Sequence, residues 1–231
     1  MRAETTRDSQ AGMTLLEIMV SMAIMVSMLS IAWTTFSGGL TLKRNSETIN
    51  ERFHEIRVAM STMVRDMSSA YISANEDQGK QERRTLLIGK DGSDVGDLRF
   101  TTMSHRVLWA DANESEQTMV SYYAEDDPDD KGKTNLIRRE SRRLTEEKWD
   151  KDPAEIDVLL RDIQEVKFEY YDWNEKDWRE TWDSTKTDGQ RGKLPSRIRF
   201  TIELENENGD EVKFTSQARL MLQEELKFFT N

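Results

Sequence analysis

The stretch that decides the fold is "GMTLLEIMVSMAIMVSMLSIAW", residues 12–33, in which Glu17 is the only ionisable side chain. From Ile18 to Leu42 the chain carries no Asp, Glu, Lys or Arg. A helix rises ~1.5 Å per residue, so this uncharged run of about 25 residues is long enough to cross a hydrocarbon core of ~30 Å. We therefore predict one membrane-spanning helix.

The rest of the chain is too polar for a second span. Of 231 residues, 33% are charged, and the mean hydropathy is -0.77. Residues 76–231 are long enough to form one domain with a hydrophobic core. The formal net charge of -11 argues against nucleic acid as a partner, because phosphate binding needs a concentrated basic face. The chain contains no cysteine, which excludes disulfides and thiolate metal sites.

The order of small and apolar residues at the N-terminus is not that of an ordinary secretory signal. Such a signal places its small-residue cleavage site after the apolar region. Here "AG", residues 11–12, stands in front of it. Cleavage after Gly12 would remove a hydrophilic leader, residues 1–12, and would leave the whole hydrophobic helix on the mature chain.

The motif from Gly12 to Glu17, followed by a long uncharged run, resembles the N-terminal motif of type IV pilins and type II secretion pseudopilins. In that family a prepilin peptidase cuts after the glycine and methylates the new first residue. The resemblance implies that Gly12 is the cleavage site, that Met13 is methylated, and that Glu17 is the family's glutamate at position five of the mature chain. It also implies an inner-membrane protein with a cytoplasmic N-terminus before cleavage and a periplasmic C-terminal domain.

Glu17 also has a physical interpretation of its own. A carboxylate near the end of a spanning helix costs a few kcal/mol unless it is paired. Cleavage after Gly12 would create a terminal ammonium four residues upstream. In a helical assembly, Glu17 of one subunit can pair with that terminus of its neighbour. The alternative places Glu17 in the headgroup zone of an uncleaved signal anchor that holds a binding domain at the membrane.

Beyond Leu42 the apolar residues recur at alternating spacings of four and three, which predicts an amphipathic helix over 43–73. This amphipathic helix continues the membrane-spanning half of the same helix, residues 13–42. We interpret the methionines of the amphipathic half as residues that pack in the core. Gly38 and Gly39 lie near the junction, where a kink and a hinge both remain open interpretations. The stripe consists of Ile49, Phe53, Ile56, Met60, Met63, Met67 and Tyr71.

The remaining chain has the alternating pattern of β-strands. Alternation is clear in "EVKFEYYDW", residues 165–173, and in "RIRFTIELE", residues 197–205. Asn208-Gly209 then indicates a tight hairpin into a strand over 212–222. Shorter strands are predicted at 84–89, 97–103, 118–125 and 135–141, with polar linkers at 74–84, 125–134 and 145–157. One long helix followed by six to eight mostly antiparallel strands is an α+β, pilin-like fold.

The C-terminal third resembles the J minor pseudopilins of type II secretion. The resemblance rests on Trp178 and Trp182, followed by Leu194-Pro195 and then by an alternating strand. At the other end of the chain, the presence of Glu17 favours the J or I type of minor pseudopilin over the K type. It implies a subunit that joins the I and K minor pseudopilins and the major pseudopilin at the pseudopilus tip. Such a tip primes assembly and helps to export folded proteins across the outer membrane. The alternative is a W-type minor pilin of a type IV pilus.

An acidic loop, "AEDDPDDKGK", follows the strand predicted at 118–125. Its carboxylates are Asp126, Asp127, Asp129 and Asp130. Clustered oxygen ligands are what Ca²⁺ requires, but the spacing matches no EF-hand loop. We interpret the run as a solvated turn and predict no metal, with calcium as the weaker alternative.

The basic cluster is "RRESRR", residues 138–143. On a strand its arginines would fall on both faces, and acidic runs at 126–130 and 146–152 flank it, so we predict local ion pairs rather than a ligand site. A set of tryptophans, Trp173, Trp178 and Trp182, fits either residues that cover the core or interface anchors.

The chain has no Gly-rich phosphate loop, serine elbow or metal triad, and its histidines show no catalytic spacing, so we predict no enzymatic activity and no cofactor.

Overall fold

The computed structural model describes residues 14–74, 84–90, 97–107, 112, 114–144, 151–187, 190–206 and 209–222. The chain divides into two compact units, residues 1–54 and 55–231. Its elements are one helix and ten strands in the described residues, where the sequence predicted six to eight strands. The predicted α+β class, one long helix followed by antiparallel sheets, is confirmed.

Helix α1 runs from Leu15 to Ser68, which confirms the single long N-terminal helix. It is continuous through Gly38 and Gly39. It ends before residue 73 because the chain turns there to pair with strand β2 (Asp97–Thr102), with Ala70 bridging to Thr102. Backbone carbonyls of the last turn accept hydrogen bonds from other segments, including that of Ser68 from the Met221 amide at 3.2 Å, so the helix end is satisfied without further turns.

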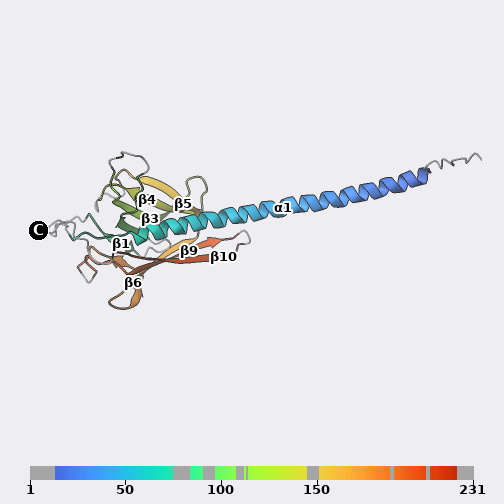
Figure 1. Ribbon diagram of the computed structural model, residues 1–231. Coiled ribbons are helices and arrows are strands. Elements are labelled where there is room, and N and C mark those ends of the chain that lie inside the picture. Colours follow the sequence, from blue (N-terminus) through green and yellow to red (C-terminus); the bar gives the residue numbers. More distant parts are fainter. Residues whose placement is uncertain are drawn as a thin grey trace, which may run out of the picture. The chain divides into compact units, whose positions relative to one another are not determined.

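The strands form two antiparallel sheets, drawn around the C-terminal part of α1 in Figure 1. The first sheet has the order β5-β4-β3-β2-β1-β8, and the second has the order β10-β9-β6-β7. The first comprises β1 (Leu87–Lys90), β2 (Asp97–Thr102), β3 (Thr118–Asp126), β4 (Thr134–Ser141), β5 (Glu155–Ile163) and β8 (Trp182–Asp183). The second comprises β6 (Glu165–Asp172), β7 (Asp177–Arg179), β9 (Arg197–Glu205) and β10 (Glu211–Arg219).

One hydrophobic core joins the end of α1 to both sheets. Burying each large apolar side chain stabilises the fold by roughly 1.5–3 kcal/mol. Met63 and Met67 are fully buried, which confirms that these methionines pack in the core, whereas Ile49 and Phe53 of the predicted stripe are exposed. The core includes Ile56, Ala59, Met63 and Met67 from α1, Leu98, Phe100, Tyr122 and Leu136 from the first sheet, and Phe168, Tyr170, Ile198 and Phe200 from the second.

Strand β9 has the bounds that its alternation predicts, and it pairs with β10 as the expected hairpin. Gly209 in the turn has a φ of +82°, a conformation that favours glycine. Asn208 lies outside the described residues.

The prediction of a linker over 145–157 is wrong at its end, because β5 begins at Glu155. The first four residues of this edge strand are exposed, although Ile156 and Val158 alternate with Glu155 and Asp157 in the sequence as in a strand.

Candidate functional site

Two features of the chain are candidates for function: the N-terminal segment of α1 and a buried ionic network in the globular unit. Glu17 lies in the first turn of α1 and is exposed. The hydroxyl of Thr14 accepts a hydrogen bond from the Glu17 amide at 3.3 Å. Thr14 therefore caps the helix, and Glu17 occupies the third helical position, where a carboxylate favours the positive end of the helix dipole. Gly12 and Met13 lie outside the described residues.

The apolar face of α1 has no protein cover in its N-terminal half. An 18-residue window of this helix has a mean hydropathy of 2.1, and none of the window is buried. Among the described residues, α1 is the one helix long and apolar enough to cross a membrane. Side chains such as Leu16, Met25 and Leu29 expose well over half of their surface, which is costly in water and favourable in lipid.

The ionic network begins at Asp66, a fully buried carboxylate on the core-facing side of α1. Its Oδ2 accepts hydrogen bonds from Arg138 Nε at 2.7 Å and from the Tyr122 hydroxyl at 2.8 Å. Its Oδ1 lies 3.2 Å from Arg65 Nη2. Burying a carboxylate is costly unless it is paired and hydrogen-bonded, and here both oxygens have partners. The network therefore ties the last turns of α1 to β3 and β4.

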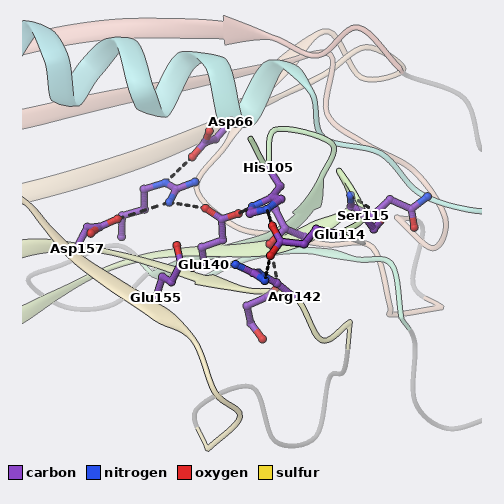
Figure 2. Close-up of polar contacts among 12 residues, drawn as sticks. Asp66, His105, Glu114, Ser115, Glu140, Arg142, Glu155 and Asp157 are labelled. Carbon is purple, nitrogen blue, oxygen red and sulfur yellow. Dashed lines mark hydrogen bonds and ion pairs between the residues drawn. The ribbon is translucent and has the colours of Figure 1, made fainter. Parts of the chain in front are cut away.

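From Arg138 the network continues through Glu140 to His105, and Figure 2 labels these last two residues together with Asp66. Arg138 Nη1 lies 2.7 Å from Glu140 Oε2. His105 Nδ1 lies 2.6 Å from Glu140 Oε1, and His105 Nε2 lies 3.1 Å from Glu114 Oε2. An ionised carboxylate only accepts hydrogen bonds, so a ring bonded to two carboxylates donates from both nitrogens. The geometry is that of an imidazolium held between two glutamates.

The pKa directions agree with this geometry. Burial acts to lower the pKa of His105, but its hydrogen bonds to Glu114 and Glu140 outweigh burial and raise the pKa above 6.5. Burial acts to raise the pKa of Glu140, and the charges of Arg138 and His105 reverse this and lower it. Burial and the nearby Asp66 carboxylate raise the pKa of the Tyr122 phenol, which therefore stays protonated as a donor.

Replacement of His105 by glutamine is expected to have a pH-dependent effect on stability. The folded-state pKa of His105 is raised, so its contribution is complete below pH 6.5 and is lost as pH rises through the folded-state value. The loss in the free energy of unfolding caused by His105→Gln should therefore shrink between about pH 6 and pH 9. Urea unfolding of both proteins across this range measures it, and a constant difference would contradict an ionised His105.

The acidic loop is organised by one of its carboxylates. Asp127 Oδ1 accepts hydrogen bonds from the amides of Asp129 at 2.8 Å and Asp130 at 3.2 Å, and Asp127 Oδ2 accepts one from Asn135 Nδ2 at 2.8 Å. These hydrogen bonds lower the pKa of Asp127. This is the geometry of an Asx turn. Across the ranges that the structure describes, no group of three or more His, Asp or Glu side chains is arranged to hold a metal ion.

The "RRESRR" cluster forms ion pairs, and one of them, Arg143 with Asp152, uses an acid of the predicted flanking runs. Arg142 contacts Glu114 at 2.5 Å and Glu155 at 3.2 Å, and Arg143 lies 3.4 Å from Asp152. Arg138, in contrast, points into the network and pairs with Asp66, a partner that the flanking acidic runs did not suggest.

The tryptophans differ in their environments. Trp182 is buried against Tyr170 and donates from Nε1 to the Lys193 carbonyl at 3.0 Å, so it is a core residue. Trp178 lies under the Arg199 guanidinium, which is 4.2 Å from its ring centroid. Trp173 is 68% exposed at the turn between β6 and β7.

Comparison with known protein families identifies the family of the chain. Residues 34–214 match the model of the type II secretion system protein J family, and residues 7–33 match the prokaryotic N-terminal methylation motif. The chain belongs to the type II secretion protein J family. It is therefore a pilin-like pseudopilin, a structural subunit and not an enzyme. The methylation motif and the apolar helix that overlaps it fit a membrane-anchored protein.

One similar solved structure is the GspK-GspI-GspJ complex of the type 2 secretion system from enterotoxigenic Escherichia coli. The matching chain is 19% identical, the TM-score is 0.48, and the alignment covers 73% of this chain and 97% of that chain. No curated protein sequence matches the chain significantly.

Proposed function

We propose that this family member is a minor pseudopilin at the tip of the type II secretion pseudopilus, where it primes assembly and helps to export folded proteins across the outer membrane. The observation that carries this proposal is the joint match to the protein J family and to the methylation motif in one chain. The expected partners are the I and K minor pseudopilins, the major pseudopilin and the prepilin peptidase.

The proposed topology follows from the same motif. The peptidase removes residues 1–12 at the cytoplasmic face of the inner membrane and methylates Met13. Residues 13–42 then cross the membrane once, residues 43–73 form the amphipathic half of the helix, and residues 76–231 lie in the periplasm. The exposed apolar surface of α1 supports this arrangement, because lipid before assembly and neighbouring helices after it would cover that surface.

We propose that Glu17 pairs with the N-terminal ammonium of a neighbouring subunit. Glu17 is exposed on α1, so its carboxylate is accessible to another chain. N-methylation keeps the positive charge of the terminus, and at membrane depth an ion pair avoids two unpaired charges. The pair forms only after cleavage after Gly12, which would couple processing to assembly.

Replacement of Glu17 by alanine is expected to leave processing intact and to abolish most incorporation into the pseudopilus. In a host strain lacking the native gene, Glu17→Ala should give a mature protein of normal size but little cross-linking to other pseudopilins and little export. Ser21→Ala, one turn further along α1, is the matched control and should assemble normally. Efficient assembly of Glu17→Ala would contradict the charge pair.

The same deletion strain tests whether the protein serves type II secretion or a type IV pilus. Without the gene, type II substrates should accumulate in the periplasm while any type IV pili assemble normally. Loss of pili with normal export would instead support a W-type minor pilin, and a requirement for the uncleaved leader would support a membrane-anchored binding domain.

A further inference from the structure

A cleft of about 300 Å³ opens beside the ionic network, between the end of α1, the segment after β2 and strand β4. Its lining includes Arg65, Ser104, His105, Arg106, Glu114 and Arg142. We propose that this cleft binds a carboxylate-bearing segment of a partner protein. The proposal concerns the globular unit and does not depend on the role assigned to Glu17.

The charge of the lining is opposite to that of the whole chain. Five cationic side chains, four arginines and the imidazolium of His105, line the cleft together with three glutamates. The chain as a whole has a formal net charge of -11. A local excess of positive charge in a concave, partly desolvated site focuses the potential on an incoming anion.

Two of the three lining glutamates have both oxygens engaged by cations. Both oxygens of Glu114 are engaged, one by His105 and the other by Arg142 at 2.5 Å. Both oxygens of Glu140 are engaged in the same way, by His105 and by Arg138. Arg65 and Arg138 are also paired with the buried Asp66, and Arg142 with Glu155, so Arg106 is the lining cation that is left for an anion among the described residues.

Two hydrogen-bonding groups of the cleft are unused within the described part of the chain. Arg106 is exposed and forms no ion pair there. The Ser104 hydroxyl is buried to nine-tenths, lines the cleft and has no hydrogen-bond partner among the described residues. A buried hydroxyl without a partner costs about 1–3 kcal/mol, so a ligand oxygen that accepts its hydrogen bond is favoured. Guanidinium and hydroxyl donors together match a carboxylate.

A protein carboxylate fits this cleft better than a phosphate. Among the described lining residues, Arg106 is the cation without a carboxylate partner, so it matches the single charge of a carboxylate and leaves the second charge of a phosphate dianion uncompensated. Val107, which follows Arg106, is 41% exposed and offers apolar contact to a peptide chain beside its acidic side chain.

The test uses the full chain in non-ionic detergent micelles at low salt, because screening weakens such contacts. Fluorescently labelled hexaglutamate with blocked termini is the probe, and hexaglutamine with blocked termini is the uncharged control. Arg106→Gln removes the unpaired guanidinium, and Ser104→Ala removes the unpaired hydroxyl. Arg161→Gln is the matched control, because its side chain is 71% exposed on β5 and does not line the cleft.

Hexaglutamate should bind the wild-type protein and Arg161→Gln equally, and hexaglutamine should bind neither. Arg106→Gln should weaken binding about tenfold, as expected for one lost charge-assisted hydrogen bond, and Ser104→Ala by about threefold. Equal binding of hexaglutamate to Arg106→Gln and the wild type would overturn the proposal. So would inorganic phosphate that binds the cleft and is not displaced by hexaglutamate, since that outcome indicates a small-anion site.

Discussion

Replacement of Arg138 by methionine is expected to lower the free energy of unfolding by about 3–5 kcal/mol, because it leaves a buried carboxylate without its main counter-charge. Asp66 is fully buried, and Arg138 Nε lies 2.7 Å from its Oδ2. In the variant, Asp66 keeps only the Tyr122 hydroxyl and the half-exposed Arg65. Urea unfolding of the full chain in micelles, followed by tryptophan fluorescence, measures the loss.

Two further variants separate charge burial from packing. Arg161→Met removes an arginine whose side chain is largely exposed, and it should change the free energy of unfolding by less than about 1 kcal/mol. The double variant Asp66→Leu with Arg138→Met removes both buried charges and should be more stable than Arg138→Met alone. A loss for Arg138→Met no larger than that for Arg161→Met would contradict the role of this network.

Replacement of Gly89 by alanine is expected to lower the free energy of unfolding by about 3 kcal/mol, at the upper end of the usual cost of overpacking. A Cβ at Gly89 in β1 would lie 1.9 Å from the Tyr170 hydroxyl oxygen and 2.2 Å from its ring carbon Cζ. Tyr170 belongs to β6 of the other sheet and is fully buried, so it has little room to move. Gly89 therefore permits the close approach of the two sheets.

A double-mutant cycle tests this contact directly. In a Tyr170→Leu background the ring is absent, and Gly89→Ala should cost much less than it does in the wild type. Gly38→Ala is the control for the substitution itself, because no heavy atom lies within 4 Å of a Cβ at that position. An equal cost of Gly89→Ala in both backgrounds would show that the clash with Tyr170 does not set its effect.

The parts of the fold that the sequence predicts are those encoded by local patterns. The uncharged run after Glu17 predicts the helix, and the strict alternation of Ile198, Phe200, Ile202 and Leu204 predicts β9 with its observed bounds. Strand β5 escapes prediction because the charged stretch with Pro153 before it is typical of a linker, and because the successive Leu159 and Leu160 break the alternation that begins at Ile156. Strands β7 and β8 are too short to show a period.

The candidate functional sites also differ in whether a local sequence pattern predicts them. The segment from Gly12 to Glu17 is recognisable because its residues are contiguous. The ionic network is not, because Asp66 and Arg138 are 72 residues apart and meet only after the sheets have formed. A local signal was nevertheless available: Asp66 lies three residues after Met63 and so on the same face of α1, and an acid on the buried face of a helix requires a buried cation.

The intact mass of the protein extracted from its native membrane tests the central claim most directly. A pseudopilin processed at Gly12 should have the mass of residues 13–231 plus one methyl group, and fragmentation should place that methyl group on the amino nitrogen of Met13. The same measurement on a strain that lacks the prepilin peptidase should give the full chain. A wild-type protein that retains residues 1–12 would contradict the account.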